Sequence, residues 1–352
     1  MDNKLPPNAY GFRMPAEWTH HEATWLAWPH EQTDWPGKFE NIPWIYGDIV
    51  RHLARHERVN ILTENEDAVE GIRNLLKKCD ATLDAVTFHP VQTNRSWTRD
   101  FCPTFLRNSE GSLAAVDWSF NGWSKYDNAE HDNAVGEELA RRLDLQTWRP
   151  VFNGKPVVLE GGSIEVNGVG ALITTEECLL SDVQVRNPGM TRADYERLFS
   201  DYLGVTHTIW LKRGIAGDDT HGHVDDLVRF IDPHSVVTVI EENMHDANYQ
   251  PLQENFAILR ESTDHVGRPL LLHTLPMPDP IYFDGQRLPA SYANFYIANH
   301  VVLVPVFNDR HDRFALNTIA GLFPEHEVIP IYSRDLVLGL GTLHCMTQQQ
   351  PV

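Results

Sequence analysis

Cysteine is scarce in this sequence, and so are long apolar runs. The four cysteines, Cys79, Cys102, Cys178 and Cys345, show no Cys-x-x-Cys pair and no close spacing, so a disulfide framework is not expected. Residues 1–18 lack the apolar stretch of a signal peptide. No segment approaches the roughly 18 consecutive apolar residues of a membrane span. We therefore expect a cytoplasmic protein without a membrane partner.

Basic residues are also few relative to acidic ones. The sequence has 29 Lys and Arg and 49 Asp and Glu, which gives a formal net charge of −20. Binding to nucleic acid requires a basic surface that neutralises phosphates, so we do not expect a nucleic-acid partner. A negative surface would attract a cationic small molecule. An acidic composition is equally ordinary for a soluble cytosolic protein, so the charge alone selects no function.

No low-complexity segment or Ser/Gly linker divides the chain, so we expect residues 1–352 to form a single domain. Stretches with helical periodicity alternate with short β-branched or apolar runs. The alternation predicts an α/β fold built from loosely repeated units. The expected helices span 42–56, 67–79, 130–143 and 191–203, and the expected strands span 58–62, 85–89, 235–240, 300–306 and 327–331.

Four local signals predict helix boundaries and turns. Thr191 followed by Asp194 resembles a capping box, and Gly204 stands where a helix-ending glycine is expected. Residues 163–174 read as a hairpin whose Asn167–Gly168 pair suits a type I′ turn. Residues 232–235 form a second turn between two apolar runs.

Cys345 is a candidate nucleophile near the end of the chain. It follows Gly339 and Gly341, and glycines let a ligand approach the backbone closely. It precedes a polar run of glutamines, which argues against a purely apolar setting. The alternative is a small buried side chain without chemistry. A nearby cation would lower the pKa of the thiol and populate the thiolate.

His223 and Asp225 are separated by one residue. In an extended strand such residues point to the same face, so both could line one pocket, where the histidine could move protons near neutral pH. A solvated polar turn is the simpler interpretation. A third is a metal cluster formed together with His221, although no HExxH or Cys/His spacing supports it.

Asp100 and Glu160 are candidate carboxylates. Asp100 follows Trp97 and Arg99, so it is either a carboxylate beside an aromatic wall that suits a planar cation, or one half of a surface ion pair with Arg99. Glu160 precedes two glycines. It could orient His223 through a carboxylate–imidazole hydrogen bond, or it could cap a turn.

Seven segments, taken in order along the chain, resemble one known family. They are residues 14–18, 25–30, 97–100, 160–163, 174–180, 217–225 and 344–351. The family that they resemble is the agmatine deiminase family, which is related to the peptidylarginine and arginine deiminases, and the similarity extends over the whole chain. Such a resemblance implies a five-bladed α/β propeller of the pentein type, with pseudo-fivefold symmetry and the active site in its central channel.

The resemblance also implies a reaction. Agmatine would be hydrolysed to N-carbamoylputrescine and ammonia, a step toward putrescine, through a covalent thiouronium on the cysteine, without metal or organic cofactor. L-Arginine and peptidylarginine are alternative substrates, an amidinotransferase would share the intermediate, and a non-catalytic metal- or ligand-binding protein is a rival of another class. A homodimer is a family-based expectation.

By the same resemblance, each candidate residue has a role. The catalytic residues would be Cys345 as nucleophile, His223 as proton carrier and Glu160 as its orienting carboxylate. The substrate would be held by Asp100 and Asp225 at the guanidinium, by Trp97 as an aromatic wall, and by Asp219 at the distal ammonium, the last by charge alone. Six residues depart from the family pattern and leave the choice of guanidine open: Cys102, Glu165, His221, Leu340, Thr342 and Leu343.

Overall fold

The strands form a set of small sheets that share one connection pattern. The structure is a computed structural model that describes residues 5–352. Within these residues the chain forms one four-stranded sheet, four three-stranded sheets and two short hairpins. In each three-stranded sheet the central strand pairs antiparallel with the strand before it and parallel with the strand after it. A helix connects each parallel pair, as such crossovers require.

The three-stranded units follow one another along the chain. The first has β4 (Thr104–Arg107), β5 (Leu113–Val116), α4 (Glu130–Arg142) and β6 (Gln146–Trp148). The second has β9 (Glu165–Val166), β10 (Ala171–Thr175), α5 (Glu176–Leu180), α6 (Arg192–Leu203) and β11 (His207–Leu211). The third has β12 (Val228–Phe230), β13 (Ser235–Ile240), α7 (Tyr249–Glu261) and β14 (Leu271–Pro276). The fourth has β17 (Tyr296–Ala298), β18 (Val301–Val306), α8 (Asp312–Leu322) and β19 (Glu327–Tyr332).

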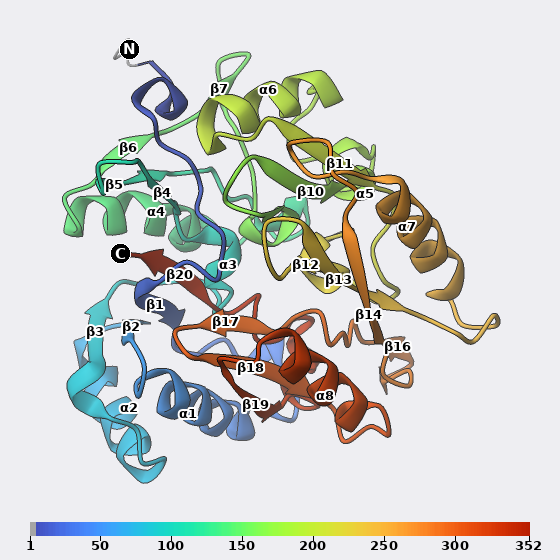
Figure 1. The fold of residues 1–352 in the computed structure, drawn as a ribbon. Helices are drawn as coiled ribbons and strands as arrows, with labels where there is room; N and C mark the ends of the chain where they lie inside the picture. The colour runs from blue at the N-terminus through green and yellow to red at the C-terminus, as the bar shows by residue number, and fades with distance from the viewer. Residues whose placement is uncertain (1–4) are drawn as a thin grey trace.

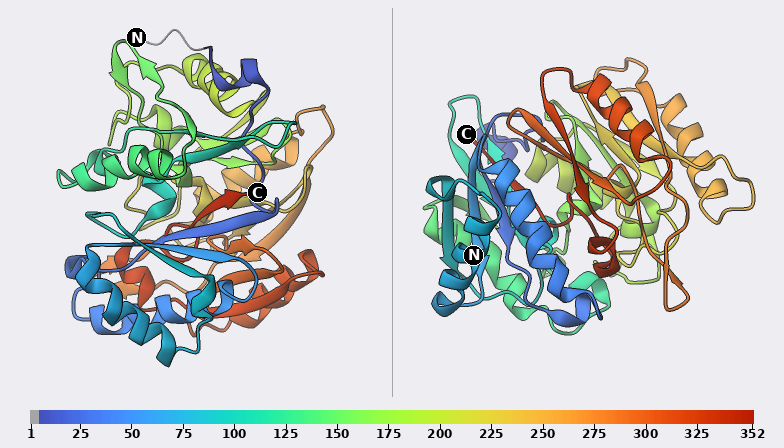
Figure 2. Two further views of the ribbon diagram at one scale, coloured as in Figure 1. Left: turned by 90° about the vertical axis from the view of Figure 1, so that its left-hand side faces the viewer. Right: turned by 90° about the horizontal axis from the view of Figure 1, so that it is seen from below.

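The four-stranded sheet joins the two ends of the described chain. Its order is β20-β1-β2-β3, and β20 runs antiparallel to β1, with Gln348 opposite Trp25. The connecting helices are α1 (Ile42–Leu53) and α2 (Glu66–Lys78). The strands are β1 (His21–Ala27), β2 (Arg58–Thr63), β3 (Val86–Pro90) and β20 (Gln348–Pro351). In Figure 1, β1 and β20 lie near the middle of the molecule, and the long helices lie toward its periphery, as Figure 2 also shows from two other sides.

The buried apolar side chains of the sheets and helices form two clusters. The larger apolar cluster runs from Trp25 to Met346 and includes Trp97 and Cys345. A smaller cluster packs α6 against the sheets of β4–β6 and β9–β11, with Phe199 and Leu203 fully or almost fully buried. No helix within residues 5–352 is long and apolar enough to cross a membrane.

The α/β prediction is confirmed, together with the expected helices and strands to within a few residues. The capping box of Thr191 and Asp194 is present, and Gly204 ends α6 in the left-handed conformation. The type I′ turn is wrong. Such a turn needs positive φ at both central residues, and Gly168 has it but Asn167 does not. Instead the Asn167 side chain accepts the N–H groups of Val169 and Ala171, which holds a longer loop.

Candidate active site

One cavity brings together side chains from distant parts of the chain. Its volume is about 260 Å³, and Cys345, Asp100, Trp97 and Asp219 all line it. Among the other lining residues are Asp34, Arg95, Trp123, Tyr126 and Leu340. Of the remaining residues predicted to act here, His223, Asp225 and Glu160, each is almost completely buried and lies behind the wall of this cavity, as the contacts below establish.

Cys345 lies between η8, a 3₁₀ helix (Leu336–Gly339), and β20. The two glycines before it allow the loop to pack on aromatic rings, because a Cβ at Gly339 would lie 2.7 Å from the Trp35 indole and one at Gly341 2.9 Å from that of Trp97. The amide of Asn294 donates to Cys345 Sγ at 3.1 Å. The thiol itself points at Asp225 Oδ2, 3.7 Å away.

Electrostatics keep this thiol protonated when the site holds no cation. Burial raises the pKa of Cys345 well above its usual range, and the carboxylates of Asp225, Asp226 and Asp100 raise it further. A cation placed between these groups would offset their negative charge and favour the thiolate. The site is therefore arranged so that a positively charged ligand ionises the sulfur.

Asp100 lies on α3, a single turn (Thr98–Phe101), and both its oxygens are fixed. The backbone N–H of Gly162 donates to Oδ1 at 3.0 Å, and Trp123 Nε1 donates to Oδ2 at 2.8 Å. Burial raises the pKa of Asp100 to about 6, opposed by the nearby His223 and assisted by Asp225 and Glu160. The alternative of a surface ion pair with Arg99 is wrong, because Arg99 is buried and contacts Glu17.

His223 reaches the site from a curved loop rather than a strand. It precedes the 3₁₀ helix Val224–Asp226, so the expectation of an extended His-Val-Asp segment is wrong. The reason is Asp218, whose Oδ2 accepts the N–H groups of Gly222 and His223 and bends the chain. The His223 ring lies with Nδ1 3.8 Å from Asp100 Oδ1. Although burial opposes the charged form, Asp100 and Cys178 raise the pKa of His223 well above its usual range.

Asp225 is held by a network that the sequence did not indicate. Its Oδ2 lies 2.7 Å from His344 Nδ1, and the other ring nitrogen of His344 lies 2.8 Å from Glu17 Oε2. Burial acts to raise the pKa of Asp225, but the His344 contact outweighs it, so the pKa is lowered. Oδ1 of Asp225 is buried without a hydrogen-bond partner among the described residues. Asp225 is thus an ionised carboxylate whose Oδ2 lies beside the Cys345 thiol and whose Oδ1 is free.

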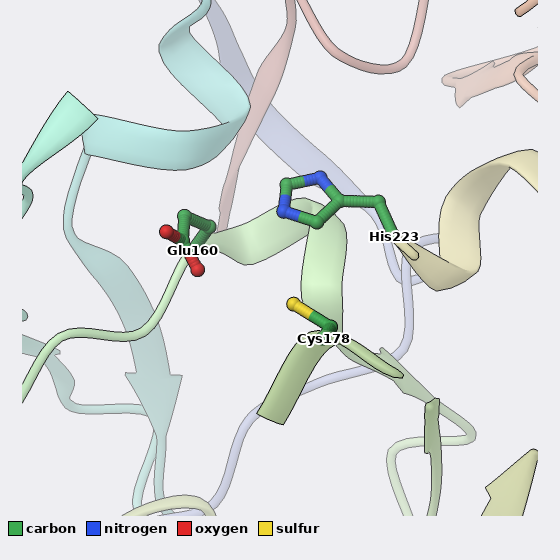
Figure 3. A group of neighbouring side chains, drawn as sticks. All are labelled: Glu160, Cys178 and His223. Atoms are coloured by element: carbon green, nitrogen blue, oxygen red, sulfur yellow. The ribbon is translucent and has the colours of Figure 1, made fainter. Parts of the chain in front are cut away.

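Glu160 contacts a different partner from the one expected. Arg186 Nε donates to Glu160 Oε1 at 2.9 Å, and no hydrogen bond joins Glu160 to His223 in this conformation. The two side chains are nevertheless close, because ligand atoms of Glu160, Cys178 and His223 all lie within 4.8 Å of one another. Figure 3 shows the three side chains facing a common space. The orienting role of Glu160 stays a prediction.

The outer part of the cavity carries paired charges and aromatic rings. Asp219 contacts Lys125, and the Tyr126 hydroxyl donates to it at 2.6 Å. Arg95 is paired with Asp34 and lies over the Tyr126 ring, 4.4 Å from its centroid. The two cationic side chains at this end, Lys125 and Arg95, are therefore each already paired with a carboxylate.

Three of the residues that depart from the expected sequence pattern have the following positions in the structure. Cys102 is buried in the apolar core and does not line the cavity. Glu165 binds Arg229, with Nε to Oε2 at 3.0 Å, and Arg229 also contacts Glu17. Leu340 lines the cavity in the left-handed conformation, with φ of +67°.

The metal cluster of His221, His223 and Asp225 is not formed, because His221 turns away and contacts the Ser181 hydroxyl. Among residues 5–352, side chains close enough together to share a metal ion occur instead in two other groups. One is Glu160, Cys178 and His223, and the other is Asp279, Asp309 and His311 near the surface.

Comparisons with known proteins agree on one relationship. The model of the Porphyromonas-type peptidyl-arginine deiminase family matches residues 13–351. A Legionella pneumophila protein is 38% identical over 356 residues, covering 100% of this chain and 98% of the relative. The agmatine deiminase of Pseudomonas aeruginosa is 36% identical, over 98% of this chain and 97% of its own. The agmatine deiminase structure of Enterococcus faecalis superposes with a TM-score of 0.91 at 30% identity, covering 99% and 98% of the two chains.

Proposed function

The chain belongs to the Porphyromonas-type peptidyl-arginine deiminase family, and we propose that it hydrolyses agmatine to N-carbamoylputrescine and ammonia. It is a hydrolase of guanidino C–N bonds, as its agmatine deiminase relatives are. One observation carries the proposal. A thiol, Cys345, lies at a cavity lined by the buried carboxylate of Asp100, and the buried Asp225 and His223 lie directly behind the cavity wall.

A guanidinium is planar and always charged, so an enzyme must first desolvate and hold it. Carboxylates grip its N–H groups in pairs. We assign this grip to Asp100 and to the free oxygen of Asp225, with Trp97 as an aromatic wall against the planar cation. The arriving positive charge offsets the carboxylates that keep Cys345 protonated, so the thiol loses its proton to solvent as the substrate binds.

The first half-reaction forms a carbon–sulfur bond. The Cys345 thiolate attacks the guanidinium carbon and gives a tetrahedral adduct. His223, held protonated by Asp100, transfers its proton to one nitrogen, and that carbon–nitrogen bond breaks to release ammonia. A cationic thiouronium remains on the sulfur, and His223 is neutral.

The second half-reaction uses water. Neutral His223 accepts a proton from water as the oxygen attacks the thiouronium carbon. As the adduct collapses, its hydroxyl releases a proton to solvent and becomes the ureido carbonyl, the carbon–sulfur bond breaks, and the thiolate is restored. Glu160 is proposed to orient the protonated ring. This role requires Glu160 Oε2, which has no hydrogen-bond partner among the described residues, to move within hydrogen-bond distance of the His223 ring.

The charges at the outer end of the cavity favour agmatine over L-arginine. Agmatine ends in an ammonium, which we assign to Asp219 as a second cation beside Lys125. L-Arginine would add a carboxylate at the same end. Arg95, the cation that lines the cavity, is already paired with Asp34, and Lys125 is paired with Asp219. A substrate carboxylate would have to break one of these pairs.

The test measures ureido product and ammonia from agmatine, L-arginine and a blocked arginine peptide, for the protein and for Cys345→Ala. We expect turnover of agmatine in preference to the other two and none in the variant. Turnover of another guanidine would reassign the substrate within the same chemistry. Transfer of the amidino group to an added amine would indicate an amidinotransferase. Binding of agmatine without any product would indicate a binding protein.

We also propose the finer architecture implied by the family. The five strand–helix units would be the blades of a five-bladed, pseudo-symmetric propeller, with the cavity in its central channel and residues 1–352 as a single domain. The repeated connection pattern of the five sheets supports this arrangement. A cytoplasmic location and a homodimer complete the proposal, and light scattering of the purified protein tests the dimer.

A further inference from the structure

A cysteine that the proposed reaction does not use lies beside its general acid. Cys178 is on α5, while Glu160 and His223 each immediately precede a 3₁₀ helix, Gly161–Ser163 and Val224–Asp226. All three side chains are almost fully buried, with exposed fractions of 2% for Cys178, 0% for Glu160 and 1% for His223. Figure 3 shows the sulfur, the ring and the carboxylate facing one another.

We propose that Cys178, His223 and Glu160 form a binding site for a thiophilic divalent cation such as Zn²⁺, and that an ion bound there inhibits the enzyme. The inhibition rests on the proposed function, because it acts by engaging His223. The binding does not depend on any activity.

Several atoms of this cluster lack a partner. Both ring nitrogens of His223 and Oε2 of Glu160 are buried without a hydrogen bond among the described residues. Buried polar atoms are nearly always satisfied, so such atoms point to a ligand that is not part of the chain. Arg186 holds Oε1 of the same carboxylate at 2.9 Å, which fixes the group and leaves Oε2 free to face the cysteine and the histidine.

The backbone holds the cluster together. The Thr175 hydroxyl accepts the N–H of Cys178 at 3.0 Å and donates to the carbonyl of Gly222 at 2.5 Å. One side chain therefore ties Cys178 to the residue that precedes His223. Gly162 lies so close that a Cβ there would be 2.5 Å from His223 Nδ1. The ligand atoms thus have little freedom to move apart.

The donor set selects the kind of ion. Sulfur, imidazole nitrogen and one carboxylate oxygen suit Zn²⁺ and its neighbours, whereas Mg²⁺ and Ca²⁺ prefer oxygen alone. Zinc bonds of about 2.0–2.3 Å place tetrahedral ligands roughly 3.3–3.8 Å apart. The present separations of up to 4.8 Å must therefore shorten, the longest by about 1.0–1.5 Å. Arg186 opposes a cation here, whereas the carboxylates of Asp100 and Asp225 act on His223 and favour positive charge.

Inhibition follows from the chemistry of the ring. A His223 nitrogen that binds a metal cannot deliver a proton to the leaving ammonia, and the thiouronium cannot be hydrolysed without a base. The ion would also take the Glu160 oxygen that is proposed to orient the ring.

Co²⁺ is the probe for binding, because a thiolate bound to it gives an intense charge-transfer absorption. The test titrates Co²⁺ and then Zn²⁺ into the intact protein, Cys178→Ser, Cys345→Ala and, as a matched buried-cysteine control, Cys102→Ser. We expect the band in all but Cys178→Ser, and Zn²⁺ should displace it. Cys178→Ala, with circular dichroism for both, separates loss of the ligand from loss of the fold.

Three outcomes would overturn the site: no band in the unmodified protein, a band that survives in folded Cys178→Ser and Cys178→Ala, or a band lost in Cys345→Ala. For inhibition, the Zn²⁺ concentration that halves turnover should rise by roughly tenfold or more in Cys178→Ser, measured against the metal-free rate of that variant. An unchanged value refutes the inhibition. A protein that binds Co²⁺ through Cys178 but turns over no guanidine refutes the proposed function and leaves the metal site intact.

Discussion

Asp100→Asn is the substitution that tests the site most directly. It keeps the shape of the side chain and removes its charge. The carboxylate accepts two N–H groups, from Gly162 and from Trp123. An amide has one acceptor oxygen, so the variant leaves one of these donors without its bond. The fold should survive, since that loss costs only about 1–3 kcal/mol.

The expected loss of activity comes from weaker contacts between residue 100 and the guanidinium. Of the two charge-assisted hydrogen bonds to the guanidinium, each worth about 1.5–3 kcal/mol, one would be lost and the other would weaken to a neutral one worth about 0.5–1.5 kcal/mol. The resulting loss of about 2.5–4.5 kcal/mol corresponds to a value of kcat/KM roughly 100-fold to 2,000-fold lower. The pKa of His223 should fall as well, because Asp100 is the main group that raises it against burial.

The pH dependence supplies the sharper measurement. Burial raises the pKa of Asp100 from 3.8 to about 6 in the protein without substrate. Only the ionised form binds a cation, so kcat/KM of the unmodified protein should fall as the pH drops through about 6. The acidic limb should be missing in Asp100→Asn. Asp34→Asn is the control, because the pKa of Asp34 is also raised to about 6 by burial but its carboxylate is paired with Arg95.

The reasoning would be refuted by a limb near pH 6 that persists in Asp100→Asn and disappears in Asp34→Asn. It would also be refuted if kcat/KM of Asp100→Asn stayed within about threefold of the unmodified protein, since no charged grip would then have been lost.

Two further substitutions test the packing and electrostatics around the site. Gly162→Ala places a Cβ 2.5 Å from His223 Nδ1 and 2.9 Å from Asp100 Oδ1, so kcat should fall by roughly 100-fold through misplacement of the ring; an unchanged kcat would show that the ring moves freely. Asp132→Asn tests a carboxyl whose pKa is raised to about 7 by burial. A raised folded-state pKa means that stability is lost as the pH rises from about 4 to about 7. The melting temperature of the variant minus that of the unmodified protein should therefore increase from pH 5 to pH 8. A difference that stays constant over this range would contradict the assignment.

The sequence predicts local structure correctly where the residues that stabilise an element are close together in the sequence. Helix α6 is the clearest case, because Thr191, Asp194 and Gly204 mark both ends within one segment. The loop at Asn167 was misassigned for a local reason as well. Its side chain competes with the expected turn by accepting backbone N–H groups, and a dipeptide pattern does not reveal that competition.

The site was predictable only in part, because its decisive contacts are not local. Cys345, Asp100, Trp97 and Asp219 were identified with the help of the family resemblance, and the structure gathers them at one cavity. The network behind Asp225 was missed. His344 joins Asp225 across 119 positions and Glu17 across 327, and no periodicity or spacing carries such information. His344 stands directly before the nucleophile, which is the one signal that could have drawn attention to it.

The same long separations affect how the protein is assembled. Each three-stranded sheet is made from one continuous stretch of chain, so it can close over short sequence distances. The pairing of β20 with β1 instead joins residues 348–351 to residues 21–25, and Cys345 lies just before that strand. A growing chain can therefore fold much of its body while its nucleophile is still unplaced. Cys345 meets Asn294 and Asp225 only when β20 has docked on β1, so the reactive centre depends on the contact between the two ends of the described chain.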